Sequence, residues 1–421
     1  MLYRNIEEEI NAYLKIMPVV LITGARQSGK TTLVEALIES KKIPLYTFDD
    51  EFTLANASRD PSGWLKSLPK PVAIDEVQRV KEIFLPIKQD VDQNREPGRY
   101  ILTGSANPLL LPNLSDSLAG RMGIINMYPF SQGELSKIKE TFTTYIFGDQ
   151  IDPQDKIGPF SKEDLHSTIL KGGFPPVHSF QEPLDVRRWI HSYLQTMMQK
   201  DIRDLSNIEG LREFPRLFQL LATRSAQLLN ISEMSRSLGM VHATLNRYLH
   251  LLETLFFIHL VPAWYSNLGK RITRGPKIHV CDTAIICDLI GLDHKRLIQD
   301  PQITGQLLET FVFLELLKQK SWSPFPFNIY HFRDGNYEVD LVLEKPDGTI
   351  IGIEIKTAHN LRSDDWKGLN YLKKLAPNQF KRGIVLHSGD QVQRLSDDIW
   401  AFPIQSLWHP FQNRSDMHEQ D

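Results

Sequence analysis

The sequence predicts an α/β protein with a parallel sheet in its first domain, a helix-rich middle and a second α/β domain at its C-terminal end. Three observations predict this fold class. Short apolar, β-branched runs alternate with helical patterns over residues 1–150, as in a parallel sheet covered on both faces. Closely spaced helical patterns follow from residue 214. A helical pattern at 305–318 then precedes two alternating runs at 337–343 and 350–356, which predict strands.

The composition is that of an ordinary soluble globular protein. The 421 residues are 41% hydrophobic and 24% charged, with a net charge of −3, so nucleic-acid binding would have to rest on a local basic patch. Cys281 and Cys287 make neither a disulfide framework nor a zinc site and suit a reducing cytosol, so we expect a cytoplasmic protein. No apolar run approaches the roughly 18 residues of a membrane span, and we expect no signal peptide.

A glycine-rich loop joins the first predicted strand to a helix. Residues 24–31 read GARQSGKT, which fits the phosphate-binding pattern G-x-x-x-x-G-K-S/T. The run 18–23 predicts a buried strand before the loop, and 32–38 has helical spacing after it, so a helix N-terminus would face the phosphates of ATP. Lys30 would reach the outer phosphates, and the Thr31 hydroxyl would bind Mg²⁺. The predicted nucleotide-binding residues are Gly24, Ala25, Arg26, Gln27, Ser28, Gly29, Lys30, Thr31 and Thr32.

Polar side chains follow two further predicted strands. Asp75 and Glu76 end the run 71–74, and Ser105 follows the run 100–103. Because ligands of open parallel sheets bind beyond the carboxyl ends of the strands, we expect these side chains to meet at the phosphate loop. The remaining strands of this sheet are predicted at 45–48 and 123–127.

The chemistry of phosphoryl transfer, which needs positioning and charge neutralisation, gives these residues roles. Asp75 would hold Mg²⁺, because hard cations take oxygen ligands. Glu76 would polarise the attacking water, with Lys30 on the phosphates, and Thr103 or Ser105 would align that water or contact the γ-phosphate. Arg121 is a candidate arginine finger, acting within the chain or on a neighbouring subunit. Plainer interpretations stay open: a solvated strand end for Asp75 and Glu76, and a structural arginine at position 121.

Five motifs in this order, GARQSGKT, AIDEVQ, LTGSAN, LAGR and YPFSQGEL, resemble the prokaryotic AAA-type ATPases that carry a DUF4143 region at the C-terminus. The resemblance covers nearly the whole chain. It implies an ASCE-type, AAA-type P-loop sheet with Asp75 and Glu76 as the Walker B pair, and ATP and Mg²⁺ as ligands. Arg121 matches an arginine that is common in the family. The resemblance says little about the biological task.

The middle of the chain predicts a connector and a winged-helix-like module. Residues 151–160 have the prolines, glycine and charges of a linker. Asn230 and Glu233 are spaced as a capping box for a helix that ends at Gly239, and 241–255 has the spacing of a second helix. Helix, glycine turn and helix are typical of a helix-turn-helix, with a wing starting near 256–261.

This module has a local positive charge. Residues 203–277 hold ten Lys or Arg against five Asp or Glu, so DNA is one expected partner. A protein-interaction or lid module would have the same features, so that alternative stays open. The side chains expected to meet DNA are His242, Thr244, Asn246, Arg247, Lys270, Arg271, Arg274 and Lys277.

The C-terminal region predicts a second candidate site. Glu309 lies on the helical segment, Asp340 on the first strand, and alternation puts Glu354 and Lys356 on one face of the second. If Asp340 lies across from them, the group forms a Mg²⁺ site with a lysine beside the attacking water. This layout looks like the restriction-endonuclease-like PD-(D/E)XK nuclease fold, whose acidic residues and E-x-K motif these four residues match. An ion pair of Glu354 with Lys356 explains the same residues without nuclease activity.

We therefore expect four domains: an ATPase domain at 1–150, a helical connector at 151–205, a winged-helix-like domain at 206–280 and a nuclease-like domain at 281–421. Two functions follow as hypotheses. The first is an ATPase that acts on, or is regulated by, nucleic acid. The second is an ATP-dependent regulatory switch whose C-terminal domains bind a protein partner and cleave nothing. A homo-oligomer is expected if Arg121 acts between subunits, and no membrane partner is expected.

Overall fold

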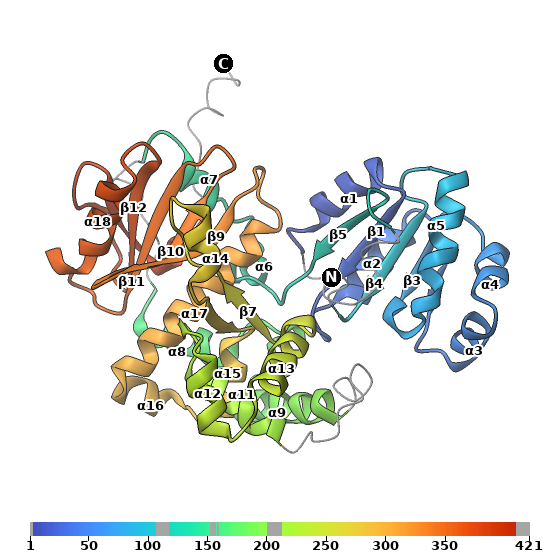
Figure 1. The fold of residues 1–421 in the computed structure, drawn as a ribbon, viewed down its shortest axis with the longest axis horizontal. Coiled ribbons are helices and arrows are strands. Elements are labelled where there is room, and N and C mark those ends of the chain that lie inside the picture. The colour runs from blue at the N-terminus through green and yellow to red at the C-terminus, as the bar shows by residue number, and fades with distance from the viewer. Residues whose placement is uncertain (1–2, 107–117, 152–156, 158–159, 200–212, 410–421) are drawn as a thin grey trace. The chain divides into compact units, whose positions relative to one another are not determined.

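The computed structural model describes residues 3–106, 118–151, 157, 160–199 and 213–409. Parts of the predicted linker and of the module 203–277, and Asn107 of LTGSAN, therefore lie outside the described residues. The chain divides into two compact units (Figure 1). Unit 1 comprises Met1–Phe130, Phe174–Pro176 and Leu249–Phe257, and unit 2 comprises Ser131–Gly173, Val177–Tyr248 and Ile258–Asp421.

A five-stranded sheet organises unit 1. Its order is β2-β3-β4-β1-β5, and each neighbouring pair is parallel, as the alternation of apolar strands with helices predicted. The carboxyl ends of β1, β4 and β3 therefore lie side by side. The elements are α1 (Glu7–Ile16), β1 (Val19–Thr23), α2 (Lys30–Glu39), β2 (Leu45–Thr47), α3 (Glu51–Arg59), α4 (Pro61–Ser67), β3 (Val72–Asp75), η1 (Val77–Arg79), η2 (Lys81–Ile83), α5 (Phe84–Gln93), β4 (Tyr100–Gly104) and β5 (Met122–Asn126).

The core of unit 1 lies between this sheet and its helices. β1, β3 and β4 are buried along their whole lengths, which explains why their sequences are continuous apolar runs rather than alternating ones. Val72, Leu102 and Ile87 belong to one cluster, which also receives Phe48 at the end of β2. Figure 1 shows α3 and α4 beyond β3, at the edge of the sheet opposite β5. Burial on both faces fixes the positions of the polar residues that follow these strands.

The first half of unit 2 is a set of helices with a small antiparallel sheet of order β6-β8-β7. Helix α12 begins as predicted, because the Asn230 side chain accepts the Glu233 N–H at 3.0 Å. The predicted reciprocal contact of a capping box is replaced by an ion pair between the Glu233 carboxylate and Arg224. The elements of this stretch are α8 (Lys162–Lys171), η4 (Pro175–Ser179), α9 (Pro183–Gln199), α11 (Phe214–Thr223), β6 (Gln227–Leu228), α12 (Ile231–Leu238), α13 (His242–Thr254), β7 (Ile258–Val261), α14 (Leu268–Thr273), β8 (Lys277–Val280), α15 (Thr283–Leu289) and α16 (His294–Gln299). The first two residues of η4 and the end of α13 from Leu249 belong to unit 1.

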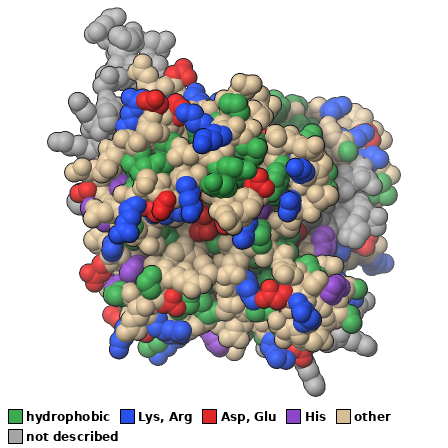
Figure 2. All heavy atoms as spheres, turned by 60° about the vertical axis from the view of Figure 1, so that its left-hand side comes forward, with side chains coloured by type: hydrophobic (Ala, Val, Ile, Leu, Met, Phe, Trp, Pro, Cys, Tyr) green, Lys and Arg blue, Asp and Glu red, His purple; other side chains and the backbone are tan. Residues whose placement is uncertain are grey.

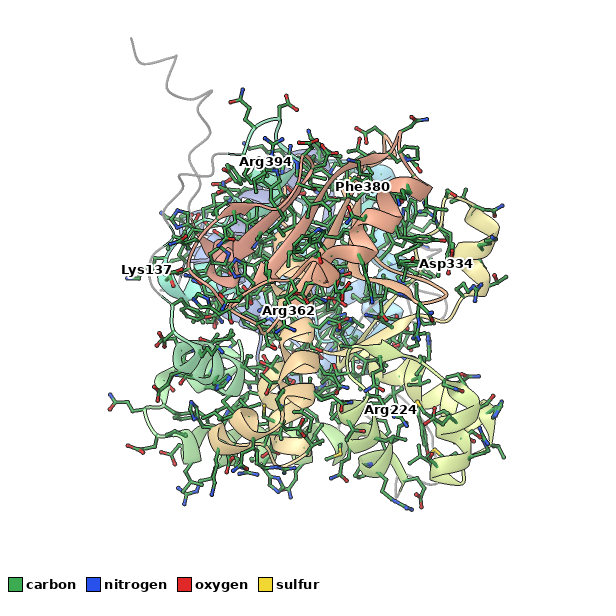
Figure 3. The ribbon with its side chains drawn as sticks, turned by 90° about the vertical axis from the view of Figure 1, so that its left-hand side faces the viewer. Lys137, Arg224, Asp334, Arg362, Phe380 and Arg394 are labelled. Carbon is green, nitrogen blue, oxygen red and sulfur yellow. The ribbon has the colours of Figure 1, made fainter. Side chains whose placement is uncertain are left out.

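A six-stranded mixed sheet forms the rest of unit 2, in the order β13-β14-β12-β11-β10-β9. Neighbours β9, β10 and β11 are antiparallel, and β11, β12 and β14 are parallel. Figure 3 shows α18 in front of this sheet, where Leu369 and Leu372 are buried. The elements are α17 (Pro301–Lys320), β9 (Asn328–Asp334), β10 (Tyr337–Glu344), β11 (Ile350–Lys356), η6 (Ser363–Trp366), α18 (Lys367–Leu375), β12 (Phe380–His387), β13 (Gln393–Arg394), β14 (Ile399–Pro403) and η7 (Ile404–Trp408).

Residues 131–150, which we expected in the first domain, belong to unit 2. They form α6 (Gln132–Ser136) and α7 (Phe142–Phe147). The Phe142 ring lies edge-on to Phe402 of β14 at 5.9 Å, and Arg382 of β12 donates to the Gly148 carbonyl at 2.8 Å. These contacts join α7 to strands more than 200 residues further along the chain, so no local pattern marked the boundary.

Arg271 anchors α14 to the six-stranded sheet. Its guanidinium forms two hydrogen bonds to the Glu344 carboxylate, at 2.6 and 2.7 Å, and both side chains are 12% exposed. It also lies over the rings of Trp264 and Tyr330, 5.4 and 5.0 Å from their centres. The predicted role of Arg271 as a DNA phosphate contact is therefore corrected, because its charge is already paired inside unit 2.

Glu140 makes the stability of unit 2 depend on pH. Burial raises its pKa from 4.5 to about 8, and the nearby Glu315 and Glu134 carboxylates add to this. The folded state therefore holds a proton that the unfolded state releases, so this contribution is complete below pH 4.5 and is lost as the pH rises through about 8. We predict that Glu140→Gln, which stays neutral, flattens the fall in melting temperature between about pH 5 and about pH 8. An equal fall in Glu140→Gln and in the exposed control Glu163→Gln would contradict this.

Candidate nucleotide site

The loop after β1 has the backbone that the phosphate-binding pattern requires. A Cβ at Gly24 would lie 2.0 Å from the Met127 carbonyl oxygen, and Gly29 adopts φ +94°, so a side chain is excluded at the first position and strained at the second. Helix α2 begins at Lys30, so the unpaired N–H groups of its first turn lie at the loop. The positive end of the helix and the glycine-containing loop, whose backbone N–H groups can face a phosphate, together favour the binding of an anion.

Lys30 lies back on this loop. Its Nζ donates to the carbonyl oxygens of Gly24 and Ala25, both at 2.9 Å, and the residue is 5% exposed. The ammonium is thus held within the loop that would receive the phosphates. The other predicted nucleotide-binding residues differ in exposure: Ala25 and Ser28 are buried, Arg26 and Thr31 are half-buried, and Gln27 and Thr32 are exposed.

Oxygen ligands for a cation converge beside the loop. The Thr31 hydroxyl lies 3.2 Å from each oxygen of the Asp75 carboxylate. Thr103 at the end of β4 donates a short hydrogen bond to the same carboxylate, and Thr47 at the end of β2 lies 3.5 Å from it. A hydroxyl and a carboxylate side by side are the donors that Mg²⁺ prefers, so these residues fit the ion.

Glu76 belongs to a second network, which includes a residue that the sequence analysis missed. The Gln78 amide donates to the Glu76 carboxylate and, at 2.8 Å, to the Ser105 hydroxyl. The Ser105 hydroxyl donates to the same Glu76 oxygen at 3.1 Å. Glu76 has φ +57°, which is uncommon for a residue with a side chain. Two sequence signals could have found Gln78: its position two residues after Glu76, and its place as the last residue of the AIDEVQ motif.

Arg121 lies at the amino-terminal ends of the strands, whereas the phosphate loop lies at their carboxyl ends. It immediately precedes β5, and its carbonyl accepts the N–H of Val19 at the start of β1, whereas the phosphate loop follows Thr23 at the end of β1. The five residues of β1 separate these two ends of the sheet by roughly 15 Å. Its guanidinium pairs with Asp92 instead. The interpretation of Arg121 as a finger within its own chain is therefore corrected, and a role toward a neighbouring subunit stays a prediction.

The four nuclease-like residues lie in unit 2, and the structure brings them together. In the antiparallel pairing of β10 with β11, Leu341 faces Ile353, which puts Asp340 across from Glu354 as expected. The Asp340 carboxylate accepts the Ile355 N–H at 2.8 Å, and Lys356 pairs with Glu354 at 2.8 Å. Glu309 of α17 is linked to Asp340 by Lys277, whose ammonium lies near both carboxylates. The sequence analysis did not place Lys277 here.

Lys277 of β8 lies among the carboxylates. Its Nζ is 2.7 Å from Glu309, 2.8 Å from Glu338 and 3.9 Å from Asp340. Although burial opposes its charged form, these three carboxylates raise the pKa of Lys277 above its ordinary value, so it is an ammonium. We call Glu309, Glu338, Asp340 and Glu354 the acidic cluster. The predicted contact of Lys277 with DNA is corrected, since the residue is 2% exposed.

Comparison with known families agrees with the geometry of unit 1. Residues 17–136 match the model of the AAA domain family (AAA_14), and residues 304–407 match a domain of unknown function, DUF4143. The chain contains an AAA domain and a C-terminal DUF4143 region. Residues 162–296 of this AAA-domain protein match a second domain of unknown function, DUF8612.

Relatives of the AAA-domain protein extend over most of its length. An uncharacterized protein of Mycobacterium tuberculosis is 28% identical over 96% of this chain and 84% of its own. One of Methanocaldococcus jannaschii is 24% identical over 78% of this chain and 73% of its own. Among solved structures, a Walker-type ATPase of Pyrococcus abyssi aligns with a TM-score of 0.44 at 15% identity, covering 69% of this chain and 96% of that one.

The described residues of the AAA-domain protein include neither a ready metal cluster nor a membrane-spanning helix. Within them, no group of three or more His, Cys, Asp or Glu side chains has the arrangement of a metal site, and no helix is both long and apolar enough to cross a membrane. Unit 2 has a cavity of about 610 Å³ between α8, α9, α15 and α16. None of the predicted site residues lines it.

Proposed function

We propose that this AAA-domain protein binds Mg²⁺-ATP and hydrolyses it at loop 24–31. The observation that carries the proposal is the convergence of Lys30, Thr31 and Asp75 at the carboxyl ends of adjacent parallel strands. Lys30 would bind the outer phosphates, and Thr31 and Asp75 would hold Mg²⁺, which neutralises phosphate charge when bound. Glu76 would orient the attacking water and accept its proton, with Ser105 beside it.

The test is nucleotide binding and phosphate release by the full chain, with Mg²⁺ or with a chelator. We expect Mg²⁺-dependent turnover in the wild type and loss of ATP binding in Lys30→Ala. Lys41→Ala is the matched control, because Lys41 is exposed just beyond α2 and its ammonium donates to the Asn11 side chain at 3.3 Å, away from loop 24–31. A wild type without ATP binding, or a Lys30→Ala variant that turns over at the wild-type rate, would refute the proposal.

Gln78 is predicted to be a positioning residue for this reaction. Its amide group joins Glu76 to Ser105, so its loss frees both side chains near the place of the attacking water. Gln78→Ala should lower kcat about tenfold and leave KM for ATP unchanged. A misplaced base stabilises the transition state less, whereas the binding of ATP in the ground state does not depend on it. Gln78→Asn, one methylene shorter, should not restore the rate. A raised KM at constant kcat would show that Gln78 acts on ATP binding instead.

We also propose that the segment 214–280 contacts nucleic acid, as a winged helix does. The order α11, β6, α12, α13, β7, β8 and the antiparallel pairing of the strands support this. His242, Asn246 and Arg247 are exposed at the start of α13. The basic surface is smaller than expected from sequence, because Arg271 and Lys277 are paired internally. Figure 2 likewise shows Lys and Arg dispersed among other side chains on the face that it draws, without a basic stripe.

Binding of a labelled DNA duplex at several salt concentrations tests this second proposal. Affinity should fall as salt rises, because phosphate contacts release counterions, and Arg247→Ala should weaken binding and reduce the salt slope by about one. Arg188→Ala, an exposed arginine on α9, serves as the control. Absence of DNA binding, together with ATP turnover that DNA does not change, would favour the regulatory switch that acts on a protein partner.

A further inference from the structure

The counterion of the acidic cluster is Lys277, which lies outside the DUF4143 region. Lys277 belongs to β8, within the segment that matches DUF8612, whereas its carboxylate partners lie on α17 and β10. Its ammonium lies within 2.8 Å of two of them and 3.9 Å of a third. An Mg²⁺ ion bound by the same carboxylates would need to occupy the same space, at about 2.0–2.1 Å from their oxygens.

Other carboxylate oxygens of the cluster that could bind a metal ion also accept hydrogen bonds from within the chain. Lys356 donates to Glu354, and the second oxygen of Asp340 accepts the Ile355 N–H. Each of the four carboxylates thus has a recorded partner, and two ammonium groups lie among them. A dication entering beside Lys277 would meet a positive charge within a few ångströms, in surroundings that screen charge poorly.

The position of Lys277 is fixed by its backbone as well as its charge. β8 is the central strand of its sheet, and Lys277 is in register with Leu228 of β6 on one side and Val261 of β7 on the other. The side chain is 2% exposed. Removing the ammonium from the cluster therefore requires either a different side chain at position 277 or a displacement of β8.

We propose that Lys277 is the resident cation of the acidic cluster and that it excludes divalent metal ions from the DUF4143 region in this conformation. The cluster then fastens β8 to α17 and β10. Any metal-dependent chemistry at Asp340, Glu354 and Lys356 is blocked until β8 moves. This inference is independent of the proposed ATPase activity, because it concerns residues of unit 2 alone.

The test is Mn²⁺ binding by the full chain, measured by electron paramagnetic resonance without nucleotide. An Asp75→Asn background removes the metal ligand of the nucleotide site. We expect no Mn²⁺ site that depends on Asp340 in this background, and about one such site per chain after Lys277→Gln. Adding Asp340→Asn should abolish the new site, and Lys277→Arg should remain without it. Lys373→Gln, whose lysine pairs with Asp398 away from the cluster, should gain no site.

Either of two results would overturn the proposal. One is an Mn²⁺ site in the Asp75→Asn background that Asp340→Asn removes, which would show that metal and Lys277 coexist. The other is a Lys277→Gln protein that is folded by circular dichroism and gains no site. If Lys277→Gln does not fold, the comparison with and without Asp340→Asn still decides, because a metal site lost with Asp340 refutes the proposal and its absence supports it.

Discussion

Replacing Glu76 with glutamine is expected to lower ATP turnover by about 10²–10⁴-fold while ATP affinity stays within about twofold of the wild type. Glutamine has nearly the same shape as glutamate but cannot accept a proton from water. Glu76 does not contact Lys30, Thr31 or the loop carbonyls in any recorded hydrogen bond, so the phosphate-binding residues should be undisturbed. Phosphate release gives kcat, and titration of a fluorescent ATP analogue gives the affinity.

The control for this variant is Glu82→Gln. Glu82 is exposed on η2, six residues after Glu76 in the chain, and its substitution should leave both turnover and affinity unchanged. Equal turnover in Glu76→Gln and the wild type would mean that Glu76 is a solvated strand end, the plainer interpretation of the sequence. A joint loss of turnover and affinity would point instead to a general disturbance of the loop.

Replacing Arg271 with methionine should produce the largest loss of stability, about 3–5 kcal/mol in the unfolding of unit 2. Methionine fills much of the same volume but leaves the Glu344 carboxylate, 12% exposed, without its two strongest hydrogen bonds. The Trp264 ring nitrogen, which donates to Glu344 at 3.0 Å, would remain as its partner. The stacking of the guanidinium on the Trp264 and Tyr330 rings would also be lost.

Urea unfolding followed by circular dichroism measures this loss, with Arg274→Met as the matched control. Arg274 is exposed and lies over Tyr265 at 5.7 Å, so its substitution should cost less than about 1 kcal/mol. Although burial opposes ionisation, the hydrogen bonds from Arg271 and Trp264 lower the pKa of Glu344. The contribution of the pair is therefore present above pH 4.5 and lost as the pH falls below it. A difference between the variants that persists unchanged in acid would contradict this account.

The sequence by itself determined the features of unit 1 that depend on neighbouring residues. Loop 24–31 needs glycine where the backbone turns, and the apolar run before it and the helical spacing after it fix which way the loop faces. The strand-end positions of Asp75, Glu76 and Ser105 followed in the same way, because burial on both faces gives a parallel strand a continuous apolar sequence. In unit 2, the period of two along a strand placed Glu354 and Lys356 on one face, whereas the register of the two strands, which puts Asp340 across from Glu354, came from the structure.

Only the tertiary structure decided which of these charged residues remain available for a ligand. From the sequence, Arg271 and Lys277 were interpreted as exposed charges, because the carboxylates that pair with them lie 73 and 32 residues further along the chain. Gln78 joined Glu76 to Ser105 because β3 and β4 are neighbours in the sheet, and Arg121 fell at the wrong edge of that sheet for its own phosphate loop. Hydrophobic spacing is a local property and is readable from sequence. The pairing of a buried charge depends on which distant segment folds against it, and a charged residue has the same sequence signature whether it is buried in an ion pair or exposed to solvent.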